Sequence, residues 1–148
     1  MMVTYVAGAV GLFIGFATVS ADSPSLTWAV VLIVVAGGGL SFVRHSIFHR
    51  SDAARMGWTS PGRNNFQIEV GIANLSWAAV ALVAVILDWG IAVQAATLLT
   101  FGTYLAGSAA MLVLSSSKNR SRSLGPVIAM ALFGVMQIVL GVLGMSAG

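Results

Sequence analysis

The sequence predicts an all-α integral membrane bundle of five transmembrane helices. Of its 148 residues, 58% are apolar and only 7% are charged, whereas soluble domains carry about 25% charged residues. The apolar residues form five segments near the roughly 20 residues that cross a bilayer. The segments also lack the alternation that a membrane β-barrel requires. The length favours one domain, residues 1–148.

The first predicted span needs a separate argument, because Val19-Ser20-Ala21 resembles a signal-peptidase site. A signal peptide carries basic residues before its apolar run, and none precedes this one. We therefore interpret the segment as a true span. The second span extends at least to Val43 and can continue to Phe48. The predicted spans cover about residues 3–20, 27–43, 66–87, 91–114 and 124–145.

All basic residues lie in two loops that the five spans place on one side of the membrane. They are Arg44, Arg50, Arg55 and Arg63 between spans two and three, and Lys118, Arg120 and Arg122 between spans four and five. The other two loops carry Asp22 and Asp88. The positive-inside rule then predicts a cell-membrane protein with a cytoplasmic N-terminus and an outer C-terminus, anchored at the outer interface by Trp28 and Trp89.

Charge and cysteine content exclude several classes of function. The net charge of +3 arises from these loop residues and is a topology signal, so nucleic acid is not a predicted partner and the lipid bilayer is. Cysteine is absent, which excludes disulfides, thiol catalysis and cysteine-ligated metals. No nucleophile elbow or comparable catalytic spacing occurs.

Small residues recur within the spans, as pairs such as Gly11 and Gly15 or Gly134 and Gly141 illustrate. Small residues let membrane helices approach closely, which favours their association. They indicate either a face for a homo-oligomer or larger complex, or packing inside the bundle. The second interpretation is favoured because every span carries them.

The most informative stretch opens the third span. Gln67 and Asn74 are seven residues apart and share a helix face, whereas Glu69 lies about 200° around the helix from Gln67. Polar groups at membrane depth usually face protein or a cavity, so we expect this helix to be central. The role of Glu69 can be interpreted in two ways. In the first, it complements the helix N-terminus and pairs with Arg63 or Arg44. In the second, it couples protons or ions along a path with Gln67, Asn74, Tyr104 and Gln137.

A second polar cluster precedes the third span. His45, His49 and Asp52 are spaced i, i+4 and i+7, so they align if the second helix continues past the membrane edge. Together with Glu69 they are candidate ligands for zinc or iron. The competing interpretation is an interfacial helix with snorkelling arginines. The sequence does not identify a cofactor.

Several short motifs carry a family resemblance. They are Phe42-Val-Arg-His45, Ser51-Asp52-Ala-Ala, Gly57-Trp58 and Asn65-Phe-Gln-Ile-Glu69-Val-Gly-Ile-Ala-Asn74-Leu. This pattern is similar to the signature of a family of small bacterial and archaeal integral membrane proteins of unknown function. The resemblance covers about a quarter of the chain closely and implies a shared polar set of His45, Trp58, Gln67, Glu69 and Asn74.

The chain also departs from that pattern. Arg44 stands where the family has glycine, and Asn64-Asn65 replaces small residues and proline. The fourth span ends Leu112-Val-Leu-Ser-Ser without the histidine that the resemblance implies. A cofactor site that relies on that histidine is therefore in doubt, and the resemblance implies no activity.

We expect a non-enzymatic membrane component, either an accessory subunit of a larger complex or a homo-oligomer, in which the polar site around Glu69 organises the bundle. The first alternative is a small-solute or ion transporter that uses Glu69 with Gln67 and Asn74. The second is a metal-dependent membrane enzyme with His45 and Glu69.

Overall fold

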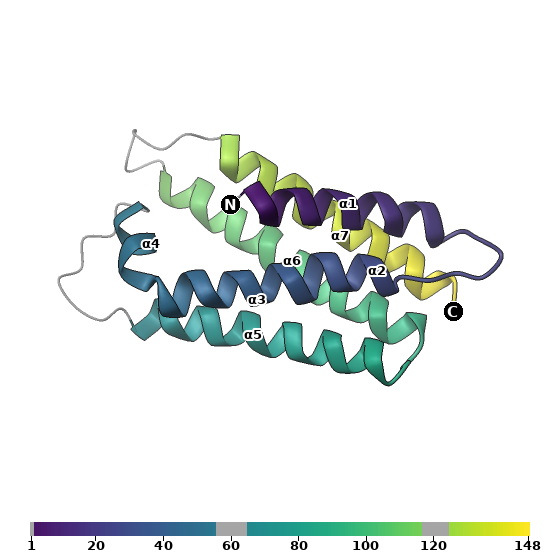
Figure 1. The fold of residues 1–148 in the computed structure, drawn as a ribbon. Helices are drawn as coiled ribbons and strands as arrows, with labels where there is room; N and C mark the ends of the chain where they lie inside the picture. Colours follow the sequence, from purple (N-terminus) through teal and green to yellow (C-terminus); the bar gives the residue numbers. More distant parts are fainter. Residues whose placement is uncertain (1, 56–64, 117–124) are drawn as a thin grey trace.

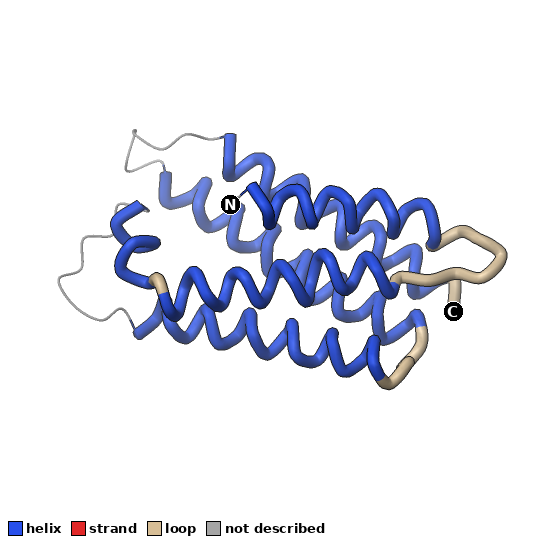
Figure 2. Tube along the Cα trace, in the orientation of Figure 1, coloured by secondary structure: helices blue, strands red, loops and turns tan. Residues whose placement is uncertain are grey.

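The computed structural model describes residues 2–55, 65–116 and 125–148, and within these ranges the chain is helical apart from short connections (Figures 1 and 2). The elements are α1 (Met2–Thr18), α2 (Thr27–Val30), η1 (Val31–Val35), α3 (Ala36–Phe42), η2 (Val43–Ile47), α4 (His49–Arg55), α5 (Asn65–Ile86), α6 (Ile91–Ser116) and α7 (Gly125–Ser146). The all-α prediction is confirmed.

Four helical stretches of the described chain are long and apolar enough to cross a membrane: Thr27–Ile47, Asn65–Ile86, Ile91–Leu114 and Gly125–Ser146. The first expected span is shorter than predicted, since the apolar helix there covers only Val3–Thr18. A turn follows Thr18, and the Thr18 hydroxyl donates across this turn to the Ser25 carbonyl. By length, this helix does not qualify as a fifth candidate span. The structure therefore supports four of the five predicted spans together with a shorter apolar helix.

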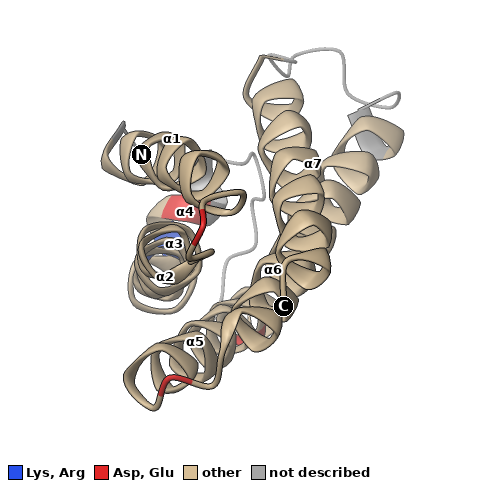
Figure 3. Cartoon of the chain, turned by 90° about the vertical axis from the view of Figure 1, so that its right-hand side faces the viewer, with Lys and Arg blue, Asp and Glu red and all other residues tan. Residues whose placement is uncertain are grey.

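The helices run side by side, with the termini toward opposite ends of the bundle (Figure 1). The view along the bundle shows α1 beside α2 and α3 on one side, and α6 crossing α7 on the other (Figure 3). Helix α5 lies at the edge, against α3 and α6. The expectation that this helix is central is thus wrong, because only one of its faces meets protein.

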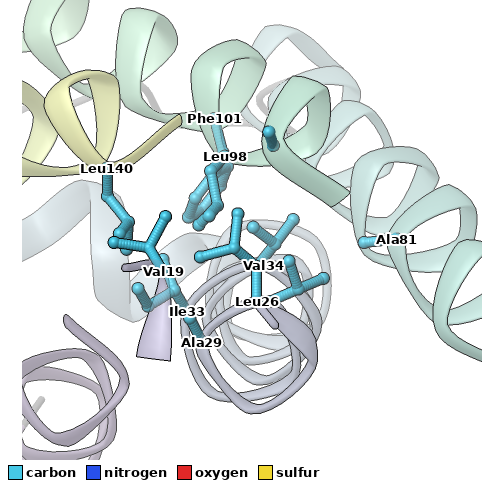
Figure 4. Close-up of a cluster of buried hydrophobic side chains, with 11 residues drawn as sticks. Val19, Leu26, Ala29, Ile33, Val34, Ala81, Leu98, Phe101 and Leu140 are labelled. Atoms are coloured by element: carbon cyan, nitrogen blue, oxygen red, sulfur yellow. The ribbon is translucent and has the colours of Figure 1, made fainter. Parts of the chain in front are cut away.

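The buried apolar cluster joins the two sides of the bundle (Figure 4). Val30, Ile33 and Val34 from α2 and η1 pack with Leu98 of α6 and Leu140 of α7, and all five are at most 1% exposed. Apolar side chains also cover the outside, as lipid requires: Phe13, Trp28, Ile86 and Leu114 are all more than 60% exposed. Apolar side chains are expected to be this exposed on a surface that faces acyl chains.

The second span is one continuous helix with two π-helical segments, η1 and η2. A π-turn widens the hydrogen-bond ring by one residue and is common at functional sites. The helix ends at Phe48, whose backbone leaves the helical region with φ −97° and ψ 27°. The second span thus continues to Ile47, and α4 begins after a bend rather than as its extension.

Small residues place the helices in backbone contact inside the bundle. A Cβ at Gly38 would lie 2.7 Å from the Asn74 carbonyl oxygen of α5. One at Gly102 would lie 2.8 Å from the Gly134 carbonyl oxygen of α7. Such closeness supports packing within one chain as the main role of these glycines. Gly107 contacts nothing within 4 Å and lies on the outside.

Replacement of Gly38 by leucine should destabilise the bundle, because the new side chain would press on the backbone of α5. We expect a loss of about 1–3 kcal/mol, the usual range for overpacking. The measurement is thermal unfolding of the purified protein in detergent. Gly39→Leu is the matched control, since a Cβ at the neighbouring Gly39 meets nothing within 4 Å. Equal melting temperatures for the two variants would contradict the packing assignment.

Candidate functional site

A network of polar side chains lies at one end of the bundle and surrounds the carboxylate of Asp52. This side chain is 1% exposed, and its Oδ1 lies 3.1 Å from Arg44 Nε. Its Oδ2 lies 2.8 Å from His45 Nδ1 and accepts a hydrogen bond from Gln67 Nε2 at 2.7 Å. A carboxylate that leaves water needs such compensation by charge and hydrogen bonds. Three segments, η2, α4 and α5, therefore meet at one buried anion.

The state of His45 follows from its neighbours. Arg44 Nη2 lies 2.9 Å from His45 Nε2, and a guanidinium can only donate. Nε2 must then accept, so the imidazole is neutral and carries its proton on Nδ1, the atom that faces Asp52. Among the residues that the structure describes, the network therefore joins one cation and one anion to a neutral imidazole.

The bend at Phe48 is what brings Asp52 into this position. The Asp52 amide donates to the Phe48 carbonyl at 3.0 Å, which starts the first turn of α4 on the far side of the bend. His49 instead directs Nδ1 to the Ser46 carbonyl at 3.1 Å. The predicted alignment of His45, His49 and Asp52 on one helix is therefore wrong, because the helix does not continue through Phe48.

Helix α5 supplies Gln67 because η2 and α5 approach closely beside it. The Ser46 side chain lies against Gly71, and its hydroxyl donates to the Ile68 carbonyl at 3.2 Å. Gln67, Gly71 and Asn74 are all buried on the same face of α5. The sequence-based expectation that Gln67 and Asn74 share a face is met. A side chain at position 71 would separate the two helices.

Other polar side chains are buried at different depths. Asn74 donates to its own helix at Val70 and, at 3.4 Å, to the hydroxyl of Tyr104 on α6. The Tyr104 ring packs at a tilt of 58° against Trp77, with ring centroids 4.6 Å apart. Gln137 is 0% exposed, and its Oε1 has no hydrogen-bond partner among the residues that the structure describes.

Sequence reasoning overlooked two features of this polar interior. Gln94 is 3% exposed and donates to Thr27 at 3.2 Å, near the end of the bundle opposite Asp52. Gln94 lies near the start of a predicted span, and no periodic pattern in the sequence indicated that it would be buried. Arg44 was considered as a topology signal and as a possible partner of Glu69, whereas in the structure its partner is Asp52.

Glu69, the residue that the sequence favoured most, lies outside the network. It is exposed on the outer face of α5, as is Ser76, whose hydroxyl bonds only within its own helix. The structure therefore separates Glu69 from Gln67 and Asn74 by facing it away from the bundle. Its assignment to an ion path or to the centre of the cluster remains a prediction without support from this arrangement.

The proposed metal ligands are likewise not gathered. His45 faces Asp52 and Arg44, His49 faces Ser46, and Glu69 faces outward. Across residues 2–55, 65–116 and 125–148, no group of three or more histidine and acidic residues is placed to hold a metal ion. Trp58, the remaining member of the predicted polar set, lies outside the described residues.

The apolar helices together with the buried polar end define a multi-pass membrane protein. A protein-family model matches residues 1–147, and the chain belongs to that family, described as a family of unknown function (DUF6790). The family-level resemblance is thereby confirmed, while the motif signature and the bacterial and archaeal distribution remain predictions. No curated protein and no solved structure matches the chain.

Neutralising the buried carboxylate should loosen α4. In Asp52→Asn, Arg44 would keep its charge without the anion that compensates it. Breaking a buried pair costs about 3–5 kcal/mol, and the low end applies because the Arg44 side chain is 36% exposed. Hydrogen–deuterium exchange should rise in α4 and the end of η2, and thermal stability should fall.

Asp88→Asn is the matched control for this substitution. Asp88 is exposed in the turn between α5 and α6 and has a positive φ of 46°, which asparagine also tolerates. We expect no change in stability or exchange there. If both variants behave alike, the Asp52 network does not hold α4 in place.

Proposed function

We propose that this protein is a non-enzymatic accessory subunit of a larger membrane complex, and that its partner docks on the outer face of α5 around Glu69. The proposal includes five spans, a cytoplasmic N-terminus and a location in the cell membrane. The observation that carries it is a carboxylate exposed on a largely apolar helix face, on which Glu69 is the charged residue.

The surroundings of Glu69 support a protein partner. Phe66 and Ile72 flank it on α5 and are 65% and 52% exposed. Glu69 lies about 6 Å along the helix axis from Asn65, the first helical residue, so it sits just inside the helix end. A charge there is costly against lipid and is favourable beside a basic side chain of a neighbouring helix. We expect the partner to supply a lysine or arginine at this depth.

The same charge argues against a symmetric dimer built on α5. In a two-fold dimer the same patch of each copy forms the interface. When the axis runs along the membrane normal, Glu69 would meet Glu69 at one depth. Two like charges at close range repel each other. The homo-oligomeric alternative then requires a different face of the second copy, such as the one that carries the exposed Arg50.

The buried network fits a structural role rather than catalysis. Arg44, His45, Asp52 and Gln67 contact one another, and the pairing leaves the carboxylate shielded from substrate. The glycines that were candidate oligomer faces also pack inside the chain: Gly15 meets Leu140, and Gly141 meets Leu99. Replacing them would disturb folding before assembly. The site thus organises this end of the bundle, and the partner surface lies elsewhere.

Transport remains a second candidate function because polar side chains are buried at several depths. Gln67 lies at one end, Asn74 and Tyr104 farther along, and Gln94 near the other end. This series would replace the path through Glu69 that the sequence suggested. Flux measurements in liposomes with Asn74→Leu would test it. Metal-dependent catalysis has weaker support, since His45 is already engaged by Arg44 and Asp52.

Glu69→Lys should release the partner, because it reverses the charge that the partner neutralises. The protein would be extracted from its own membranes in mild detergent and analysed by native mass spectrometry. We expect the wild-type chain within a larger complex, and the variant as a single chain with an unchanged melting temperature. Glu69→Gln should weaken the complex less.

Asp22→Lys provides the control, since it makes the same charge reversal at an exposed site in the connection between α1 and α2. It should leave the complex intact. A wild-type mass equal to one chain, or a complex unaffected by Glu69→Lys, would overturn the proposal. A simple multiple of the chain mass would instead favour the homo-oligomer.

A further inference from the structure

We propose that the bend between η2 and α4 is a binding site for the phosphate headgroup of an anionic phospholipid. A shallow, open pocket of about 360 Å³ lies there, lined by Ile47, Phe48, His49, Arg50 and Ser51. The site is separate from the α5 face and does not depend on the accessory-subunit proposal.

The position of the pocket points to lipid. It lies where the candidate span Thr27–Ile47 ends, at the level where a bilayer changes from acyl chains to headgroups. Ile47 and Phe48 are 60% and 59% exposed, and apolar side chains at this level pack against acyl chains. The next residue but one, Arg50, is exposed and has no ion-pair partner among the described residues. An apolar edge beside a cation is complementary to an anionic lipid.

His49 supplies a second polar group. Its Nε2 is shielded from solvent and has no hydrogen-bond partner within the described part of the chain. Nδ1 faces the Ser46 carbonyl at 3.1 Å and must therefore carry a proton. The other ring nitrogen, Nε2, is therefore the one left for a ligand, and His49 shares the pocket lining with Arg50.

The neighbouring charged residues do not compete for this ligand. Arg44 is occupied by Asp52 and His45, and the Asp52 carboxylate is buried within that network at 1% exposure. Ser51 uses its hydroxyl to donate to the Phe48 carbonyl at 2.9 Å, which leaves its oxygen as a weak acceptor only. The lining of the pocket therefore contains the Arg50 guanidinium and no carboxylate.

The test is a lipid titration of the full chain in detergent, followed by native mass spectrometry. The probes are dioleoylphosphatidylglycerol and dioleoylphosphatidylcholine, with inorganic phosphate as competitor. We expect the anionic lipid to bind more tightly than phosphatidylcholine. Arg50→Gln should weaken it about fivefold, as expected for one basic residue near a lipid surface. Inorganic phosphate should not displace the lipid, because it lacks the acyl chains.

Two substitutions at His49 separate the roles of its nitrogens. Asparagine can retain the donor to Ser46 but has no group at the Nε2 position, so His49→Asn should weaken binding about tenfold, the value of one charged hydrogen bond. Glutamine places an amide near the Nε2 position, and His49→Gln should bind more tightly than His49→Asn. Arg120→Gln removes the same charge from the other basic loop and should leave affinity unchanged.

Each contrary result would overturn the proposal. Equal affinity for the two lipids would remove the role of charge. Equal loss in Arg50→Gln and Arg120→Gln would show general electrostatic attraction instead of a site. Displacement of the lipid by an equal concentration of inorganic phosphate would identify the pocket as a site for a free anion. Melting temperatures of all variants, measured in parallel, ensure that lost binding is not lost folding.

Discussion

The burial of one carboxylate, that of Asp52, controls the arrangement at its end of the bundle. A charge removed from water at a membrane edge requires an opposite charge and hydrogen bonds. Arg44 and His45 come from η2 and Gln67 comes from α5, while Asp52 itself belongs to α4. The contacts of that single anion therefore link α4, beyond the bend at Phe48, to the long helix Thr27–Ile47 and to α5.

Close helix contact makes this compensation possible. The buried face of α5 consists of small or amide side chains, namely Gln67, Gly71, Asn74, Ala78, Ala81 and Ala84. Opposite them, Gly38 and Ser46 touch the α5 backbone or its glycine. Lipid provides no hydrophobic force between helices, so van der Waals contact and hydrogen bonds must hold them together. The same closeness delivers Gln67 to within 2.7 Å of Asp52.

Apart from the residues paired around Asp52, the exposed charged residues Glu69 and Arg50 are the basis of the two proposed interactions outside the bundle. Glu69 faces outward from α5, and Arg50 lies beside exposed Ile47 and Phe48 at the pocket on the bend. We propose that the first meets a basic side chain of a partner helix and the second an anionic lipid headgroup. For a family of unknown function, this division separates what maintains the fold from what is available to a partner or lipid.

The sequence alone determined the helical membrane class, because about 20 apolar residues in succession have few other stable forms. It also determined that Gln67 and Asn74 share a face, since helical periodicity is local. Only the tertiary structure decided the partner of His45, the bend at Phe48 and the outward position of Glu69. These depend on which helices become neighbours, and periodicity within one helix carries no information about the helix opposite. The prediction from the spacing of His45, His49 and Asp52 was wrong for this reason. It assumed one continuous helix, whereas the helix ends at Phe48 and Asp52 contacts residues of other elements.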